Sequence, residues 1–169
     1  MCAETANDLN IMTDELSRRS KDIGLKINID KTKVMCNKFA LKNNIKLDDV
    51  IFEHVESYIY FGQKLTIDKD QWDEVNRRVQ LGWNTFARLN DVFRSNLPIC
   101  LKRKVMNQCV LPVLTYGSET WTLTNRMATK LKVTQRKMER IMLGITLRDK
   151  KRNEWIRNQT RVTYVKQKH

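Results

Sequence analysis

The stretch DQWDEVNRRVQLGWNTFARLNDVF, residues 70–93, decides the fold because the spacing of the apolar side chains changes there. Within it these side chains recur every three or four residues, which places them on one face of a helix. The apolar stripe consists of Trp72, Val75, Val79, Gly82, Phe86, Leu89 and Phe93. The sequence therefore predicts a long helix that packs this face against a core.

Further helical segments are expected after residue 93. The first begins near Pro98, and its predicted inner face carries Leu101, Val105, Cys109 and Val113. Pro112 should kink or interrupt this helix, because proline lacks a backbone N–H and clashes with the preceding turn. The next helix runs from about Met127 to Leu143, with Leu131, Met138, Ile141 and Met142 inward. Residues 148–161 lack an apolar stripe, so any helix there should be partly exposed.

Shorter extended segments precede residue 70. A helix is expected from Glu4 to Asp22, with its apolar spacing set by Leu9, Met12, Leu16 and Ile23 and its stop at Gly24. Residues 25–29 alternate apolar and polar like a half-buried strand, and a second extended run passes through residues 34 and 35. Residues 45–47 and 50–52 flank Asp48-Asp49 as two strands around a tight turn, and residues 57–65 form another strand candidate.

These patterns predict an α+β fold with a small antiparallel sheet and one helix, followed by a helical bundle. The sheet-bearing segment is placed at residues 1–66, the helical region at 70–145 and a basic tail at 146–169.

Positive charge is concentrated near the end of the chain. The 169 residues carry a formal net charge of +13. From Leu123 onward there are 14 Lys and Arg against 3 acidic residues, whereas residues 1–69 hold 11 of each. Such a field favours a polyanionic partner, because each neutralised phosphate releases condensed counterions.

The cysteines and histidines give no sign of a metal site. Cys2, Cys36, Cys100 and Cys109 show no C-x-x-C spacing, and neither histidine lies near them in sequence. Free thiols in a reducing compartment are the simpler interpretation. The sequence shows no signal peptide and no transmembrane run, so we expect no membrane partner. The expected location is intracellular, with nucleus and cytoplasm left open.

Three stretches resemble the reverse transcriptase of non-LTR retrotransposons, of the endonuclease–reverse transcriptase type. GLKINIDKTKVM, residues 24–35, is similar to the palm motif that follows the catalytic aspartates. YIYFGQKL, residues 58–65, resembles the primer-grip strand pair, although Phe61 stands where leucine is commoner. CLKRKVMNQCVLPVLTYGSETWTLT, residues 100–124, and the later MERIMLGITLRDKKRNEWIR resemble the helical region after the palm. The resemblance implies a palm-like sheet followed by a thumb-like bundle.

The catalytic part of that family has no counterpart in this sequence. The family's aromatic-x-Asp-Asp turn, whose carboxylates hold two Mg²⁺ ions, would precede the first helix. The resemblance therefore implies a remnant of an RNA-directed DNA polymerase: a fragment, a truncated genomic copy or a mispredicted gene model. We expect no catalytic residue, no metal ligand and no cofactor in this chain alone, which would not be an enzyme. The upstream polymerase region would be its partner in the parent protein.

Asp48-Asp49 is the one adjacent aspartate pair, and two interpretations compete for it. It could be the metal-binding pair, but Lys46-Leu47 precedes it in place of an aromatic residue. Aspartate also favours tight turns, because its side chain bonds nearby backbone groups. We interpret the pair as a turn.

Candidate nucleic-acid contacts fall into several groups, each of which could instead be a solvated face. By resemblance, Lys31 and Lys33 could approach nucleotide phosphates, and Tyr60, Phe61 and Gly62 could press on the primer backbone. Thumb helices of the family lie along the template–primer duplex, so Arg77 and Arg78 on the polar side of the first long helix could touch phosphates. The strongest group is the basic cluster at the end of the chain: Arg126, Lys130, Arg136, Lys137, Arg140, Arg148, Lys150, Lys151 and Arg152.

RNA, DNA or an RNA–DNA duplex is the partner expected from these groups. Two other functions remain open. The chain could be a non-enzymatic nucleic-acid-binding protein retained as a host gene, or a helical protein-interaction module whose basic tail is incidental. Binding to a duplex that falls steeply with salt would separate the first two possibilities from the third.

Overall fold

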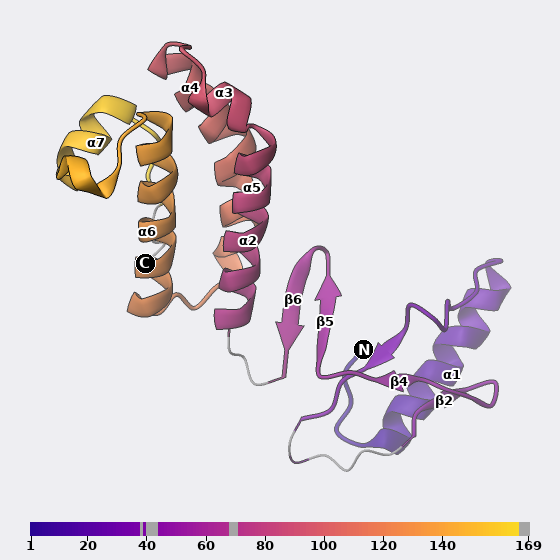
Figure 1. The fold of residues 1–169 in the computed structure, drawn as a ribbon. Helices are drawn as coiled ribbons and strands as arrows, with labels where there is room; N and C mark the ends of the chain where they lie inside the picture. Colours follow the sequence, from indigo (N-terminus) through magenta and orange to yellow (C-terminus); the bar gives the residue numbers. More distant parts are fainter. Residues whose placement is uncertain (38, 40–43, 68–70, 166–169) are drawn as a thin grey trace. The chain divides into compact units, whose positions relative to one another are not determined.

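The computed structural model describes residues 1–37, 39, 44–67 and 71–165, and the chain forms two compact units, Met1–Asp70 and Gln71–His169 (Figure 1). The first carries one helix and short strands, and the second is helical. The predicted α+β class is confirmed. The predicted segments 1–66 and 146–169 include residues 38, 40–43 and 166–169, which lie outside the described residues.

The first helix, α1 (Ala6–Asp22), has clear start and stop signals in the sequence. Thr5 is its N-cap, and its hydroxyl oxygen accepts a hydrogen bond from the Asp8 N–H at 3.1 Å. At the other end the Leu25 N–H donates to the Ser20 carbonyl at 2.8 Å, and Gly24 has φ +76°. This pattern is a Schellman cap, which needs a left-handed residue and so favours glycine. The predicted stop at Gly24 is confirmed.

The strands of the first unit are short and pair two at a time. They are β1 (Lys33–Val34), β2 (Lys46–Leu47), β3 (Val50–Ile51), β4 (Glu53–His54), β5 (Ser57–Tyr60) and β6 (Gln63–Thr66). β2–β3 is the antiparallel hairpin that the sequence pattern predicts. β5–β6 is a second antiparallel hairpin, where the pattern predicted one strand and the resemblance implied a strand pair. β1 pairs in parallel with β4, which the prediction of a purely antiparallel sheet missed.

The strand predicted at residues 25–29 is wrong. Asn28 instead closes a turn: its side-chain oxygen accepts the Lys31 N–H at 2.9 Å, and its carbonyl accepts the Thr32 N–H at 3.0 Å. Asparagine competes with strand ladders by bonding local backbone in this way. Asn28, the fourth residue of the alternating pattern, therefore forms a turn in place of a strand.

The core of the first unit is small. Val34, Ile45, Leu47 and Phe52 are its buried apolar side chains, with Leu9 of α1 packed beside them. The inner face of α1 also buries Thr13, whose hydroxyl donates to the Leu9 carbonyl at 2.7 Å. Met12 and Leu16 are exposed, although the sequence placed them on the apolar stripe.

The second unit is built from helices joined by short turns. They are α2 (Trp72–Arg88), α3 (Asn90–Arg94), α4 (Ile99–Val105), the π-helical segment η1 (Met106–Val110), α5 (Leu111–Thr115), the 3₁₀ turn η2 (Ser118–Thr120), α6 (Asn125–Met142), the 3₁₀ turn η3 (Leu147–Asp149) and α7 (Asn153–Thr160). The stripe predicted for residues 72–93 is broken near Leu89, and α3 turns Phe93 back onto Phe86, where the two rings stack at 4.2 Å.

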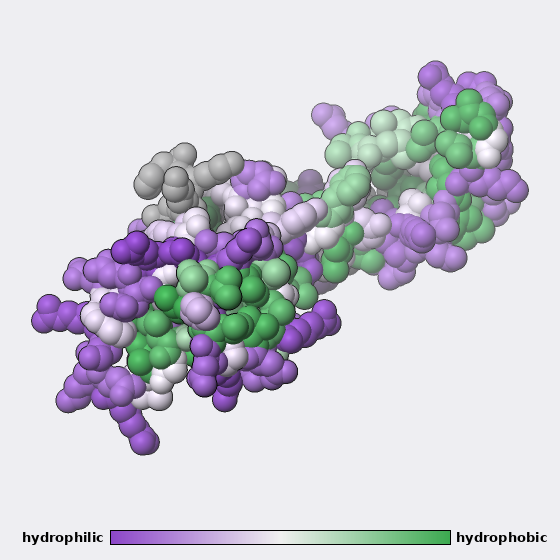
Figure 2. Space-filling view, turned by 90° about the horizontal axis from the view of Figure 1, so that it is seen from above, coloured by the Kyte–Doolittle hydropathy of each residue, from purple (hydrophilic) through white to green (hydrophobic). Residues whose placement is uncertain are grey.

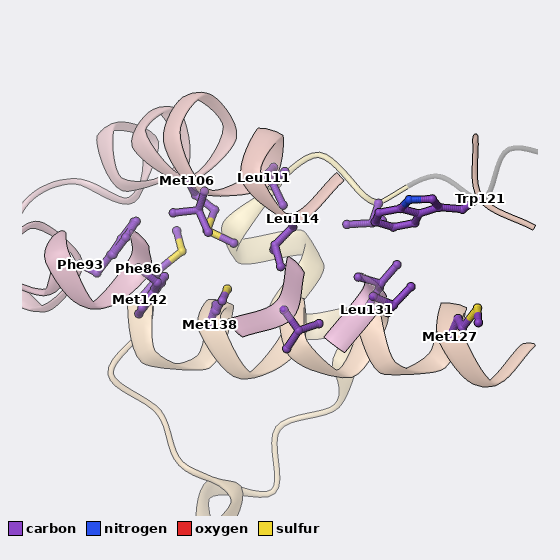
Figure 3. Close-up of a cluster of buried hydrophobic side chains, with 14 residues drawn as sticks. Phe86, Phe93, Met106, Leu111, Leu114, Trp121, Met127, Leu131, Met138 and Met142 are labelled. Carbon is purple, nitrogen blue, oxygen red and sulfur yellow. The ribbon is translucent and has the colours of Figure 1, made fainter. Parts of the chain in front are cut away.

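Figure 3 shows the core between these helices. Phe86, Met106 and Leu114 point toward Leu131, Met138 and Met142 of α6, and all are buried. The predicted inward positions Leu131, Met138 and Met142 are confirmed. α2 approaches α5 closely at Gly82, because a Cβ atom there would lie 2.4 Å from Leu114 Cδ2.

The predicted inner face of the helix after Pro98 is wrong. Leu101 and Cys109 are exposed, and Lys102, Met106 and Val110 are buried. The Lys102 ammonium reaches the carboxyl end of α6, where it donates to the Met142 carbonyl at 3.2 Å. A lysine in such a position satisfies a terminal carbonyl and the helix dipole, which explains its burial.

Pro112 interrupts the helix as predicted. The widened π-helical segment lies directly before it, at Met106–Val110, and α5 resumes beyond. Proline has no N–H to give to the preceding turn and its ring needs room there, which a wider turn provides. Within the part of the chain that the structure describes, no helix is both long enough and apolar enough to cross a membrane.

Candidate nucleic-acid interface

α6 carries five of the candidate basic side chains, more than any other helix or strand. Thr124 caps its start by accepting the Met127 N–H at 3.4 Å. Met127, Leu131 and Met138 then fix one face against the core, so basic residues fall on the remaining faces. The spacing of the apolar residues therefore decides which face of α6 packs on the core and which cations reach solvent.

Two of these cations gather around Trp72 at the start of α2. The guanidinium carbon of Arg126 lies 4.0 Å from the centre of the indole ring, and the Lys130 ammonium lies 5.2 Å from it. A cation over an indole face is held by the ring quadrupole. Trp72 therefore fixes two positive groups at one end of the helical unit.

Arg136 occupies a different environment because it is 6% exposed. It pairs with the fully buried carboxylate of Glu139, which also accepts bonds from Gln135 Nε2 at 2.8 Å and from the Thr160 hydroxyl at 3.1 Å. Gln135 Nε2 also donates to the Thr163 carbonyl at 3.0 Å. This buried polar network fastens α7 and residues 161–165 to α6.

Arg136, Lys137 and Arg140 line one cavity of about 670 Å³. The cavity lies between α6, α7 and the turn after α6, and Trp83 of α2 and Tyr164 complete its wall. Lys132 and Arg157 also line it, and none of its lining residues is acidic. Hydrophilic side chains border a hydrophobic area on the helical unit, at the left of Figure 2.

The remaining predicted cations lie on the turn between α6 and α7. Arg148, Lys150, Lys151 and Arg152 are exposed, and the Lys151 ammonium lies 5.2 Å from the centre of the Trp155 ring. Trp155 is 38% exposed. Together these side chains form the basic turn, residues 148–152, which has Asp149 as its one acidic member.

Asp149 shapes this turn. It forms a capping box with Thr146, whose backbone N–H and hydroxyl donate to Asp149 Oδ2 at 2.6 Å and 3.0 Å. These bonds, chiefly the one from the backbone, hold the pKa of Asp149 below its ordinary value, and Lys151 adds to the effect. Lys150 then takes a left-handed conformation, φ +48°, and leads the chain toward α7.

The arginines of α2 are placed otherwise than predicted. The buried Glu74 carboxylate accepts hydrogen bonds from Arg77 Nε at 2.8 Å and from Arg78 Nε at 2.6 Å. Arg78 is itself buried, with its guanidinium 4.5 Å from the centre of the Tyr116 ring. The predicted polar-face position of Arg78 is wrong, because a buried carboxylate on the same helix draws it inward. Arg77 is half-buried and forms an ion pair with the same glutamate.

The candidates of the first unit lie at the β5–β6 hairpin, except Lys33, which belongs to β1. Phe61 and Gly62 form its turn with φ +46° and +75°, and Tyr60 and Phe61 are exposed with their rings edge to face at 4.5 Å. The Tyr58 hydroxyl donates to the Lys31 carbonyl at 3.1 Å, which fixes exposed Lys31 near the base of this hairpin. Lys33 is half-buried, and its Nζ forms an ion pair with Glu53 Oε2 at 2.5 Å.

Asp48 and Asp49 form a hairpin turn, as predicted. Both have positive φ, +46° and +65°, and both are exposed between β2 and β3. Asp48 accepts the Lys21 ammonium at 3.4 Å. Among the described residues no group of three or more His, Cys, Asp or Glu side chains could hold a metal ion.

Sequence reasoning missed Lys132, Arg157, Trp83 and Tyr164. Lys132, Arg136 and Arg140 recur every four residues, and that spacing alone signals one helical face. Tyr164 carries no such signal, because its place over Arg157, 4.6 Å from the ring centre, depends on how the chain returns after α7.

Comparisons with known proteins give one clear similarity. The chain is 29% identical over 171 residues to an uncharacterized transposon-derived protein of Caenorhabditis elegans. The alignment covers 96% of this chain and 60% of the relative, so the chain spans about three-fifths of that protein's length. No family model matches the chain, and no solved structure matches it. The similarity supports a transposon origin.

Proposed function

We propose that this chain is the palm end and thumb of a non-LTR retrotransposon reverse transcriptase, which holds nucleic acid and does not polymerise by itself. The observation that carries the proposal is the basic turn, residues 148–152, standing exposed beside Lys137 and the cationic cavity of α6. Support for the family comes from the similarity to a transposon-derived protein and from three motif stretches in the order of the parent enzyme.

The chemistry of these side chains suits a nucleic-acid backbone. Exposed lysine and arginine contact phosphates without reading bases, which fixes a duplex in place by charge and shape. Arg78 and Arg136 are already paired with buried carboxylates. The proposed backbone contacts are therefore Lys137, Arg148, Lys150, Lys151 and Arg152, with Arg126 and Lys130 at the Trp72 end.

The first unit offers a second candidate contact with nucleic acid. Its β5–β6 turn presents Tyr60, Phe61 and Gly62, and a glycine allows backbone to approach a phosphate or sugar closely. Ile11, Met12 and Leu16 of α1 are exposed, and we propose that the upstream polymerase region of the parent packs on them. That region would supply the carboxylates for the two magnesium ions.

Binding to a labelled RNA–DNA duplex tests the proposal. The variant Lys150→Gln/Lys151→Gln/Arg152→Gln should weaken binding by about 10-fold or more at low salt, because it removes up to three phosphate contacts. The control is Arg18→Gln/Lys26→Gln, which removes two exposed positive charges from the first unit and should leave the affinity nearly unchanged. Fluorescence anisotropy measures both.

Equal losses in the two variants would mean that overall charge, and not the basic turn, governs binding. Primer extension on an RNA template with magnesium tests the second half of the proposal. No extension is expected from the chain alone. Addition of even one nucleotide would overturn the proposal that it does not polymerise.

A further inference from the structure

Arg136 lines the cavity beside α6 and carries a hydrogen-bond donor without a partner. Arg136 is 6% exposed, and one of its terminal nitrogens pairs with Glu139. The other, Nη2, is buried and has no hydrogen-bond partner. A buried N–H without an acceptor is costly, and an acceptor from a bound ion or water is one way to offset that cost.

The charges around this donor select an anion. Lys132, Lys137, Arg140 and Arg157 line the same cavity as Arg136, with no carboxylate among the lining residues. Arg140 is steadied by Asn153 Oδ1 at 3.0 Å, and Arg157 by the Tyr164 ring at 4.6 Å. Guanidinium groups held in this way match the oxygens of a phosphate, to which they donate paired hydrogen bonds.

The rest of the cavity suits a flat, apolar body. Trp83, Val133, Ile141, Ile145 and Leu147 form its apolar lining. A volume of about 670 Å³ lies within the usual range for sites that take a whole small molecule, and a phosphate ion alone would fill little of it. An aromatic base against this lining, with its phosphate at the cationic wall, would use both halves.

We propose that the cavity binds one unpaired nucleotide, with the phosphate at Arg140 and Arg157 and the base against the apolar lining. The inference rests on the proposed nucleic-acid function and deepens it: the basic turn holds a duplex backbone, and the cavity holds a single base that has left the stack. The buried network of Gln135, Glu139 and Thr160 keeps α7 in place and so preforms the cavity.

Calorimetric titration of the full chain with adenosine monophosphate tests the inference. We expect one site per chain, and weaker binding of adenosine and of inorganic phosphate than of the nucleotide. A single-stranded oligonucleotide should compete with the nucleotide, which separates a strand ligand from a free mononucleotide. Arg157→Gln should weaken nucleotide binding by about 10-fold, because it removes an exposed charge-assisted donor and leaves the core intact.

Val133→Trp fills the cavity without changing its charge. Val133 is 49% exposed, so the larger side chain need not disturb the core. This variant should abolish nucleotide binding and keep duplex binding, whereas Arg18→Gln/Lys26→Gln should leave nucleotide binding unchanged. Circular dichroism confirms that each variant is folded.

Several outcomes would overturn the inference. One is duplex binding without nucleotide binding, which leaves the proposed function intact. Another is phosphate binding as tight as nucleotide binding, which reduces the cavity to an anion site. A third is nucleotide binding that survives Val133→Trp. Absence of both nucleotide and duplex binding would instead remove the proposed function itself.

Discussion

The two units of this chain differ in how they combine apolar burial with charge. The unit of residues 1–70 has two-residue and four-residue strands, a small core, and balanced acidic and basic side chains over residues 1–69. The unit of residues 71–169 has long amphipathic helices, a larger core and most of the positive excess. The helical unit can therefore hold a cationic surface rigidly, and the first unit leaves apolar side chains such as Ile11 and Leu16 exposed.

The largest expected difference between the units is in hydrogen exchange. Amides in α2 and α6 should exchange roughly 100-fold or more slowly than those in α1 and the short strands, because protection follows buried apolar contact. Mass spectrometry of exchanged peptides from the full chain measures this. Stronger protection of the strands than of the helices would reverse the comparison.

Truncation of a buried side chain should show the same difference between the units as a loss of stability. Phe93 is fully buried and stacked on Phe86, so Phe93→Ala should lower the free energy of unfolding of the helical unit by about 3–5 kcal/mol. Phe61→Ala is the control, because that ring is 76% exposed in the hairpin turn. Urea unfolding followed by circular dichroism compares them. A loss below about 1 kcal/mol for Phe93→Ala would show a core that collapses around the gap.

A smaller effect should follow from Gly82→Ala. Helix propensity alone would favour alanine by about 0.8–1.0 kcal/mol. A Cβ atom at Gly82, however, would meet buried Leu114 at 2.4 Å and 2.6 Å, and overpacking costs about 1–3 kcal/mol. Net destabilisation is therefore expected in thermal unfolding. Asn84→Ala, on the exposed face of the same helix, should not destabilise, and a stabilised Gly82→Ala protein would mean that α2 and α5 separate easily.

The smallest expected effect is the response of the basic turn to a fall in pH. Because the pKa of Asp149 is lowered in the folded chain, its bonds to Thr146 stabilise the turn above the pKa of the unfolded chain. That stabilisation is lost as the pH falls through the folded pKa, which lies below the ordinary aspartate pKa of 3.8. The Thr146 amide signal in NMR spectra should therefore shift at lower pH than a free aspartate would produce. Asp149→Asn should remove the transition, and a transition that persists in this variant would assign it to another group.

The sequence predicts the parts of this structure that depend on local chemistry. The helix stop at Gly24, the turn at Asp48-Asp49 and the inward side chains of α6 follow from residue type and spacing over a few positions. The parallel pairing of β1 with β4 does not, since two residues on each strand give no pattern to read.

The candidate site was harder to predict because arginine burial depends on partners. The pattern of charges along a helix predicts that Arg78 and Arg136 are exposed. Each instead forms an ion pair with a buried glutamate three or four residues away. Glu139 stands out in retrospect as one of only 3 acidic residues after Leu123. The cavity itself required Trp83 and Tyr164, which the chain brings together from positions far apart.

The salt dependence of duplex binding tests the central claim most directly. If the basic turn contacts phosphates, the logarithm of the association constant should fall linearly with the logarithm of salt concentration. Lys150→Gln/Lys151→Gln/Arg152→Gln should reduce that slope by about 2.7 if each side chain neutralises one phosphate. Arg18→Gln/Lys26→Gln should leave the slope unchanged. A chain whose duplex affinity is independent of salt, or whose slope is the same in all three proteins, would contradict the account.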